Sequence, residues 1–221
     1  MEKINEFTQS QGHGLFWDSE IRECVFGLSP CKNDTKKYDI DSIENKFNSN
    51  ENVSIKTSSD NGFGCGDILR FYNGDFTKKY TIILIRYKQQ GLSKEVKEVI
   101  ELDYTEDLRN SLFGDVDQSI LEEYVNMIKS IPPGRVSQDV KLKYKNLKKE
   151  IQKDKNMIIN INPKVDSKSQ RRVQCSISNL DSIIEKHPEC LISRNNEPVL
   201  RGFTITGKIV SSPRKRNKKL K

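Results

Sequence analysis

The first clear hydrophobic pattern of the chain lies between Leu15 and Phe26. Apolar residues at positions 17, 21, 24 and 25 have the spacing of an amphipathic helix, and Gly27 is a residue typical of a helix end. Glu20 lies beside the apolar stripe. The pattern therefore predicts a helix that packs one face on a core and carries Glu20 next to that face.

Several later segments alternate apolar and polar residues with the period of a β-strand. In residues 52–57, Val53 and Ile55 share one face, while Ser54 and Lys56 share the other. Residues 37–40 are a shorter alternation that predicts the end of a strand. Further strands are predicted over 67–72 and 79–87, with a hairpin-like turn at 73–75 between them, and over 96–102, 157–162, 173–177 and 202–210.

Helical spacing returns in the second half of the chain. Residues 118–130 have it and stop before Pro132-Pro133-Gly134, and residues 138–153 predict a lysine-rich helix. Helices and strands thus alternate along 221 residues, a length that suits one sizeable core. We expect an α/β fold with a mixed central β-sheet flanked by helices, in a single domain over 1–210 followed by a basic flexible tail over 211–221.

Charge raises the expectation of a polyanionic partner only modestly. The formal net charge is +7, and six of the cations lie in residues 214–221. Such a tail is either a solvated terminus or a non-specific phosphate clamp. The five cysteines are spaced too irregularly for zinc pairs or a disulfide framework, and no apolar run is long enough to span a membrane. These features predict a cytoplasmic protein with no membrane contact.

Asp39 and Lys56 are the residues that first suggest a chemistry. Hydrolysis of a phosphodiester needs a metal held by hard oxygen ligands and a cation that stabilises developing charge. An aspartate at one strand end and a lysine on the polar face of the next strand supply both. Asp39 could instead cap a helix at residues 42–47, for which Asp41 is better placed, and Lys56 could be an ordinary surface lysine.

The order of these residues resembles the PD-(D/E)XK nucleases, in which an Asp precedes an acid, one apolar residue and a Lys, often with a helical Glu upstream. Asp39, Ser54, Lys56 and Glu20 match that pattern. The resemblance implies that all four are catalytic and that Asp39 and Glu20 hold Mg²⁺. Ser54 departs from the pattern because it replaces the second acid, so Glu20 would supply the missing carboxylate.

Two segments, residues 52–58 and 66–72, resemble segments of type II restriction endonucleases in particular. The resemblance as a whole covers about residues 12–87. It implies a restriction-endonuclease-like fold and sequence-specific, Mg²⁺-dependent hydrolysis of double-stranded DNA. Asp67 competes as a metal ligand, although after three glycines it is more typical of a turn. The glycine-rich stretch 62–66 has no following helix signal and predicts a flexible loop.

A basic segment near residue 170 is the candidate for DNA recognition. It combines cations for phosphate with Gln and Arg, the side chains that bind adenine and guanine edges in the major groove. A basic surface loop is the alternative interpretation. The candidate DNA-binding residues are Lys164, Lys168, Ser169, Gln170, Arg171 and Arg172.

Two other functions remain compatible with the sequence. Ser54 would also suit a DNA-binding protein that keeps a nuclease-like fold without cleaving, and the lysine-rich helices would suit a basic structural or ribonucleoprotein-associated protein. The recognition sequence, the cut position and the choice between monomer and homodimer are left open.

Overall fold

The computed structural model describes residues 12–30, 37–166 and 170–211. They form two compact units that interleave along the sequence. The first unit comprises residues up to 60, 81–103 and from 191 onwards, and the second comprises 61–80 and 104–190. The described residues of the range 1–210, which the sequence assigned to one domain, are divided between these two units. None of the described helices is long and apolar enough to cross a membrane.

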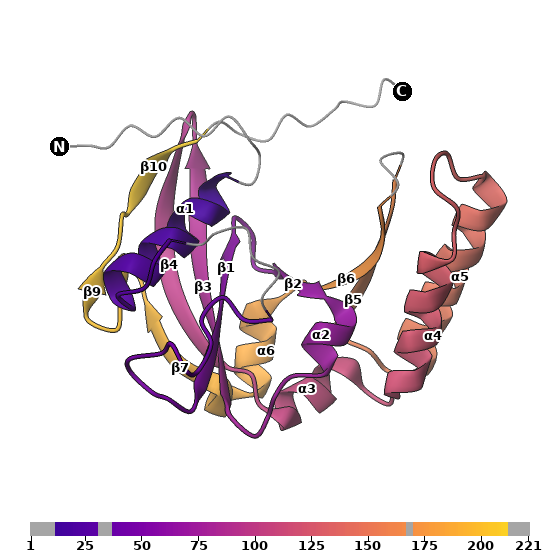
Figure 1. Cartoon of the computed structure of the whole chain (residues 1–221), viewed down its shortest axis with the longest axis horizontal. Coiled ribbons are helices and arrows are strands. Elements are labelled where there is room, and N and C mark those ends of the chain that lie inside the picture. Colours follow the sequence, from indigo (N-terminus) through magenta and orange to yellow (C-terminus); the bar gives the residue numbers. More distant parts are fainter. Residues whose placement is uncertain (1–11, 31–36, 167–169, 212–221) are drawn as a thin grey trace. The chain divides into compact units, whose positions relative to one another are not determined.

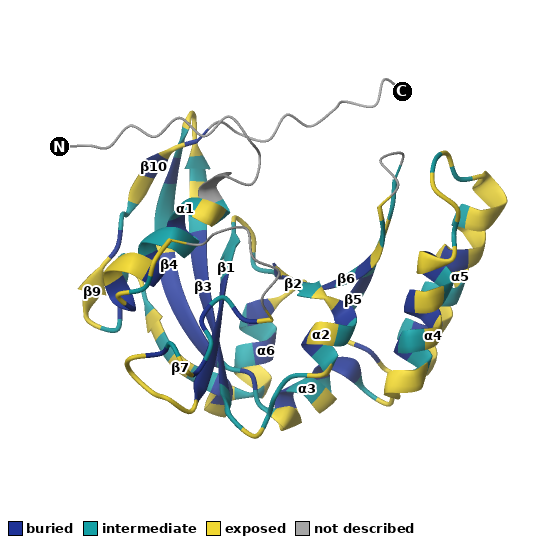
Figure 2. Cartoon of the chain, viewed as in Figure 1, coloured by how far each residue is buried: buried dark blue, intermediate teal, exposed yellow. Residues whose placement is uncertain are grey.

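The first unit is built on a mixed five-stranded sheet in the order β1 (Glu51–Ser58), β3 (Lys79–Gln90), β4 (Ser93–Asp103) and β10 (Lys208–Val210). The fifth strand, β7 (Leu191–Asn195), pairs with the second half of β4, and β10 pairs with its first residues. A two-stranded hairpin of β8 (Val199–Leu200) and β9 (Phe203–Thr204) lies between β7 and β10 in sequence. Figure 2 shows that β3 and β4 are buried along most of their length.

Helix α1 (Gly12–Glu20) continues into a π-helical turn, η1 (Ile21–Val25), and covers one face of this sheet (Figure 1). Trp17, Ile21 and Val25 pack with Val53 of β1 and Ile83 of β3 in one apolar cluster. Gly27 follows with a φ of +71°, a value that favours glycine and ends the helix. The amphipathic helix predicted from residue 15 to 26 is thus confirmed.

A buried ion cluster anchors the last part of the chain to the first unit. The Arg201 guanidinium donates to both carboxylate oxygens of Glu51 at 2.9 and 2.7 Å, and its Nε donates to Glu101 at 2.8 Å. Burial raises the pKa of Glu51, but hydrogen bonds from Arg201, Thr81 and Asn45 outweigh it, so the pKa lies below 4.5. The cluster fixes the β8–β9 hairpin.

The second unit contains a three-stranded antiparallel sheet in the order β2 (Phe63–Asp67), β6 (Arg171–Ile177) and β5 (Asn160–Val165). A stacked pair, Phe71 and Tyr104, with ring centroids 4.2 Å apart, marks its aromatic core. Its helices are α2 (Ile68–Tyr72), α3 (Glu106–Phe113), α4 (Gln118–Lys129), α5 (Gln138–Asp154), α6 (Leu180–Lys186) and the short 3₁₀ turn η2 (Pro188–Cys190).

Four local predictions are wrong, among them the hairpin-like turn at 73–75, which joins a helix to β3. Residues 68–72 form helix α2 and not a strand, because the Asp67 carboxylate accepts a hydrogen bond from the Arg70 amide at 3.0 Å and caps a helical turn. Residues 63–67 form the edge strand β2 and not a flexible loop. The predicted final strand over 202–210 is interrupted, since only Phe203–Thr204 and Lys208–Val210 are strands.

Candidate active site around Asp39 and Lys56

The candidate site begins with a single bridge between two extended segments. Ile40 and Val53 exchange backbone hydrogen bonds of 3.0 and 2.9 Å in an antiparallel bridge. In an antiparallel pair the next residues also face each other, so this bridge places Asp39 beside Ser54 and on the side of β1 that carries Lys56. Three predicted residues from two separate segments therefore adjoin.

Asp39 and Lys56 form an ion pair in which the Lys56 Nζ lies 3.0 Å from the Asp39 Oδ2. The same Oδ2 accepts a hydrogen bond of 2.6 Å from the Ile55 amide. The Asp39 and Lys56 side chains are 28% and 24% exposed, so both can be reached from solvent. This combination of fixed position and partial exposure is what an acid or a cation needs to act on a substrate.

The lysine ammonium lies between two oxygen atoms. Besides the Asp39 carboxylate, it donates to the Ile55 carbonyl oxygen at 3.0 Å. A carboxylate and a backbone carbonyl are hard oxygen ligands of the kind that Mg²⁺ binds, and Mg²⁺ sites in proteins often use one or two carboxylates and several waters. The Asp39 carboxylate and the Ile55 carbonyl are donors of that kind, but among the described residues no group of three or more His, Cys, Asp or Glu side chains that could hold a metal ion is found.

Arg22 supports this arrangement from the π-helical turn. Its side chain is buried, its Nη1 donates to the Asp39 carbonyl oxygen, and its Nε donates to the Ser29 carbonyl oxygen at 3.1 Å. The wider π turn is defined by the Phe26 amide, which donates to the Ile21 carbonyl at 3.1 Å. Such turns are frequent at functional sites. Nothing in the sequence pattern indicated that Arg22 would position Asp39.

Glu20 is held by Thr206, which follows the β8–β9 hairpin. Its Oε1 accepts hydrogen bonds from the Thr206 amide at 2.9 Å and the Thr206 hydroxyl at 2.5 Å. In the described part of the chain it makes no hydrogen bond or ion pair with Asp39 or Lys56. Its Oε2 is buried and has no hydrogen-bond partner among the described residues. Oε1 of Glu20 therefore helps to hold the fold, whereas Oε2 is a buried acceptor without a donor among the described residues.

Ser54 is 3% exposed in the middle of β1, so it is less accessible than the two residues of the ion pair. The competing acids have structural roles. Asp41 accepts a hydrogen bond of 3.2 Å from the Ile43 amide and holds a turn, and Asp67 caps α2. Of the three aspartates considered, Asp39 alone is paired with Lys56 in this part of the structure.

The structure describes four of the six predicted DNA-binding residues, and these four do not share one face. Lys168 and Ser169 lie outside the described residues. Lys164, Gln170 and Arg172 are exposed, but Arg171 is engaged with the protein. Its guanidinium donates to the carbonyl oxygens of Ile131 at 2.9 Å and Gly134 at 3.2 Å, and also to that of Pro132.

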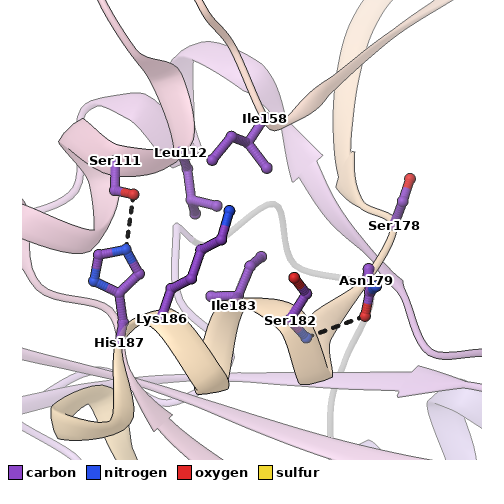
Figure 3. A pocket seen from close by; sticks show the side chains of 9 residues that line it. All are labelled: Ser111, Leu112, Ile158, Ser178, Asn179, Ser182, Ile183, Lys186 and His187. Carbon is purple, nitrogen blue, oxygen red and sulfur yellow. Dashed lines mark hydrogen bonds between the residues drawn. The ribbon is translucent and has the colours of Figure 1, made fainter.

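A small pocket of about 110 Å³ lies in the second unit (Figure 3). At its rim the Ser111 hydroxyl is 2.8 Å from His187 Nε2, and His187 Nδ1 is 3.3 Å from a Glu189 oxygen. This order is that of a serine nucleophile, a base and an acid. Glu189 is 67% exposed, and Ser111 lies inside α3, where the neighbouring amides serve the helix. We assign the pocket no catalytic role.

Comparison with models of protein families, with curated proteins and with solved structures found no match for this chain. The functional argument therefore rests on the site itself.

Proposed function

We propose that this protein is a Mg²⁺-dependent endonuclease that hydrolyses double-stranded DNA at specific sequences, with a restriction-endonuclease-like fold. The observation that carries the proposal is the ion pair between Asp39 and Lys56, held at 3.0 Å by two segments distant in sequence. Its residues occupy the positions of the PD and K elements of the nuclease pattern. A mixed sheet flanked by helices agrees with that class.

In this proposal, Asp39 and the Ile55 carbonyl are the ligands that would hold Mg²⁺, which supplies Lewis-acid stabilisation of the phosphate and an activated water. Lys56 would position that water and stabilise the charge that develops on the phosphate oxygens. Arg22 would keep Asp39 in place through its hydrogen bond to the Asp39 carbonyl oxygen. Glu20, which is half-buried and oriented by Thr206, would supply the second carboxylate.

A second candidate is a DNA-binding protein that does not cleave, and Ser54 favours it. An acid at that position would provide a second anionic ligand, while a buried serine provides none. Both candidates bind duplex DNA, and the two differ in whether a divalent metal produces cleavage.

The decisive experiment incubates the purified protein with plasmid and phage DNA in Mg²⁺ and in EDTA, followed by gel electrophoresis. The proposal expects discrete fragments in Mg²⁺ and intact DNA in EDTA. Intact DNA in both, together with sequence-dependent retention of the duplexes on a filter, would establish the non-catalytic candidate instead.

A further inference from the structure

The β5–β6 hairpin has two faces of different chemistry. On one face Val173, Cys175 and Ile177 of β6 are 0%, 1% and 5% exposed and belong to the core of the second unit. Residues of opposite parity point away from that core, because side chains alternate along a strand. The outward residues of β6 are Arg172, Gln174 and Ser176, and none of them is buried.

The register adds a matching set from β5. Asn160 is opposite Ser176, Asn162 is opposite Gln174, and Lys164 is opposite Arg172. Directly opposed residues of an antiparallel pair point to the same face. Six polar side chains therefore form three cross-strand rows, and the Asn162 amide donates to the Ser176 hydroxyl at 2.7 Å within them. We call this set the polar face of the hairpin.

Arg171 lies on the other face and binds backbone carbonyl oxygens of the protein. It is opposite Val165 and shares its parity with the buried residues of β6. Its hydrogen bonds to the carbonyl oxygens of Ile131, Pro132 and Gly134 fasten the hairpin to the connection between α4 and α5. A guanidinium used in this way holds the hairpin rigid and is not directed at a ligand on the polar face.

The dimensions of the hairpin suit the major groove of DNA. Strand β2 pairs with β6 only from Gln174 to Ile177, so the part around Lys164 and Arg172 is a two-stranded ribbon (Figure 1). A groove roughly 12 Å wide admits such a ribbon. Six residues of strand extend about 20 Å, enough to follow several base pairs.

The side chains of the polar face are those that read base edges. Arg and Lys bind the O6 and N7 atoms of guanine, whereas Asn and Gln bind the N6 and N7 atoms of adenine. At the base of the hairpin, Gly64 is opposite Ser176, and a Cβ added there would meet nothing within 4 Å, so this part of the face is open.

We infer that the polar face of the β5–β6 hairpin is the sequence-reading surface of this protein, with Arg172 and Gln174 as its principal base-contacting residues and duplex DNA in the major groove as its ligand. The inference rests on the proposed nuclease function for its substrate. It separates the two adjacent arginines, since Arg172 reads a base and Arg171 positions the hairpin.

The test measures sequence preference by binding, so that it does not depend on cleavage. Wild type, Arg172→Ala and Gln174→Ala are each incubated with a pool of random duplexes in EDTA, and the retained duplexes are sequenced. Lys149→Ala, at an exposed position of α5, is the control that removes one cation elsewhere. We expect each hairpin variant to lose roughly 5- to 150-fold discrimination at one base position, as for loss of one bidentate contact. The control should keep the wild-type preference.

Equal preferences in wild type and in both hairpin variants, or no preference in wild type, would overturn the inference. The nuclease proposal is judged separately, by cleavage of plasmid DNA in Mg²⁺ by the wild-type protein. Thermal melting of each variant checks that the surface substitutions leave the fold intact. Rescue of preference in Arg172→Lys at the same base position would further support direct contact, because Lys also donates to guanine.

Discussion

At Lys56 one ammonium group lies 3.0 Å from a carboxylate oxygen and 3.0 Å from a carbonyl oxygen. Replacing it by alanine removes the cation that would face the transition state but leaves the backbone of β1 in place. We expect Lys56→Ala to lower the single-turnover cleavage rate by about 100-fold or more, with duplex affinity almost unchanged.

Lys88→Ala is the matched control, since Lys88 is an exposed lysine in the neighbouring strand β3. It should cut DNA at the wild-type rate. A Lys56→Ala protein that cuts as fast as this control would remove Lys56 from the proposed mechanism.

The asparagine variant of Asp39 keeps the shape of the side chain and removes its charge. We expect Asp39→Asn to lose cleavage and Mg²⁺ binding together, the latter measured by isothermal titration calorimetry. Asp41→Asn, whose carboxylate only holds a turn, should retain both. If Asp41→Asn loses both properties and Asp39→Asn keeps them, then Asp41, and not Asp39, binds the metal.

Glu20 has a fold role through Thr206 and a proposed role in metal binding, and two variants separate them. Glu20→Gln keeps an oxygen that can accept from Thr206, so we expect a folded protein that cleaves at least about tenfold more slowly. Thr206→Val removes the hydroxyl donor and should lower thermal stability, with cleavage retained below the melting temperature. If cleavage by Glu20→Gln equals that of wild type, the glutamate serves the fold alone.

At the scale of single elements, the β8–β9 hairpin turns through Arg201 and Gly202, whose φ values are +50° and +84°. A two-residue turn of this kind favours Asn-Gly, so arginine is a strained choice. Arg201→Asn should therefore ease the turn but leave Glu51 and Glu101 without their guanidinium. We expect a net loss of about 3–5 kcal/mol in the free energy of unfolding, measured with urea.

The ion pair between Glu51 and Arg201 should make the stability of the fold depend on pH. The pKa of Glu51 is lower in the folded protein than its ordinary value of 4.5, so its stabilising contribution is present above pH 4.5 and is lost as the pH falls through the folded pKa. The urea midpoint of wild type should fall between pH 6 and pH 3. Arg201→Asn should show a smaller fall, and an equal fall in both would show that this cluster does not control acid stability.

Long periodic elements could be predicted from the sequence, and short ones decided by caps or tertiary partners could not. The patterns over residues 52–57, 79–87 and 118–130 correspond to β1, β3 and α4. Helix α2 was missed because five residues carry too little periodicity and a single Asp67 cap decides the outcome.

The candidate site was predictable to a similar extent. The pattern that links Asp39 to Lys56 predicted their proximity. The alternation of Val173, Cys175 and Ile177 with polar residues puts Arg171 on the apolar side of its strand and Arg172 on the polar side, a distinction that the prediction did not draw. Arg22 was missed for another reason, since its partner is a backbone carbonyl that any residue would supply.

For the whole molecule, the proposed DNA contacts separate into specific and non-specific parts. Six cations in residues 214–221, outside the described part, account for most of the formal charge of +7. Removing these residues should weaken binding to cognate and scrambled duplexes equally. The slope of log K against log salt should fall by up to about 5, and an unchanged slope would show that this segment makes no phosphate contacts.

The interleaving of the two units also sets an order of events during synthesis. Residues near the start of the chain are held by residues near its end. Trp17 and Glu20 form hydrogen bonds with Thr206, and Glu51 forms them with Arg201. Contacts between residues so far apart form late, after the intervening chain has emerged from the ribosome. An unfinished chain therefore contains Asp39 and Lys56 without the segment that completes the sheet around them. If the proposed cleavage is found, we expect it only in chains long enough to contain β10, the strand that completes the sheet.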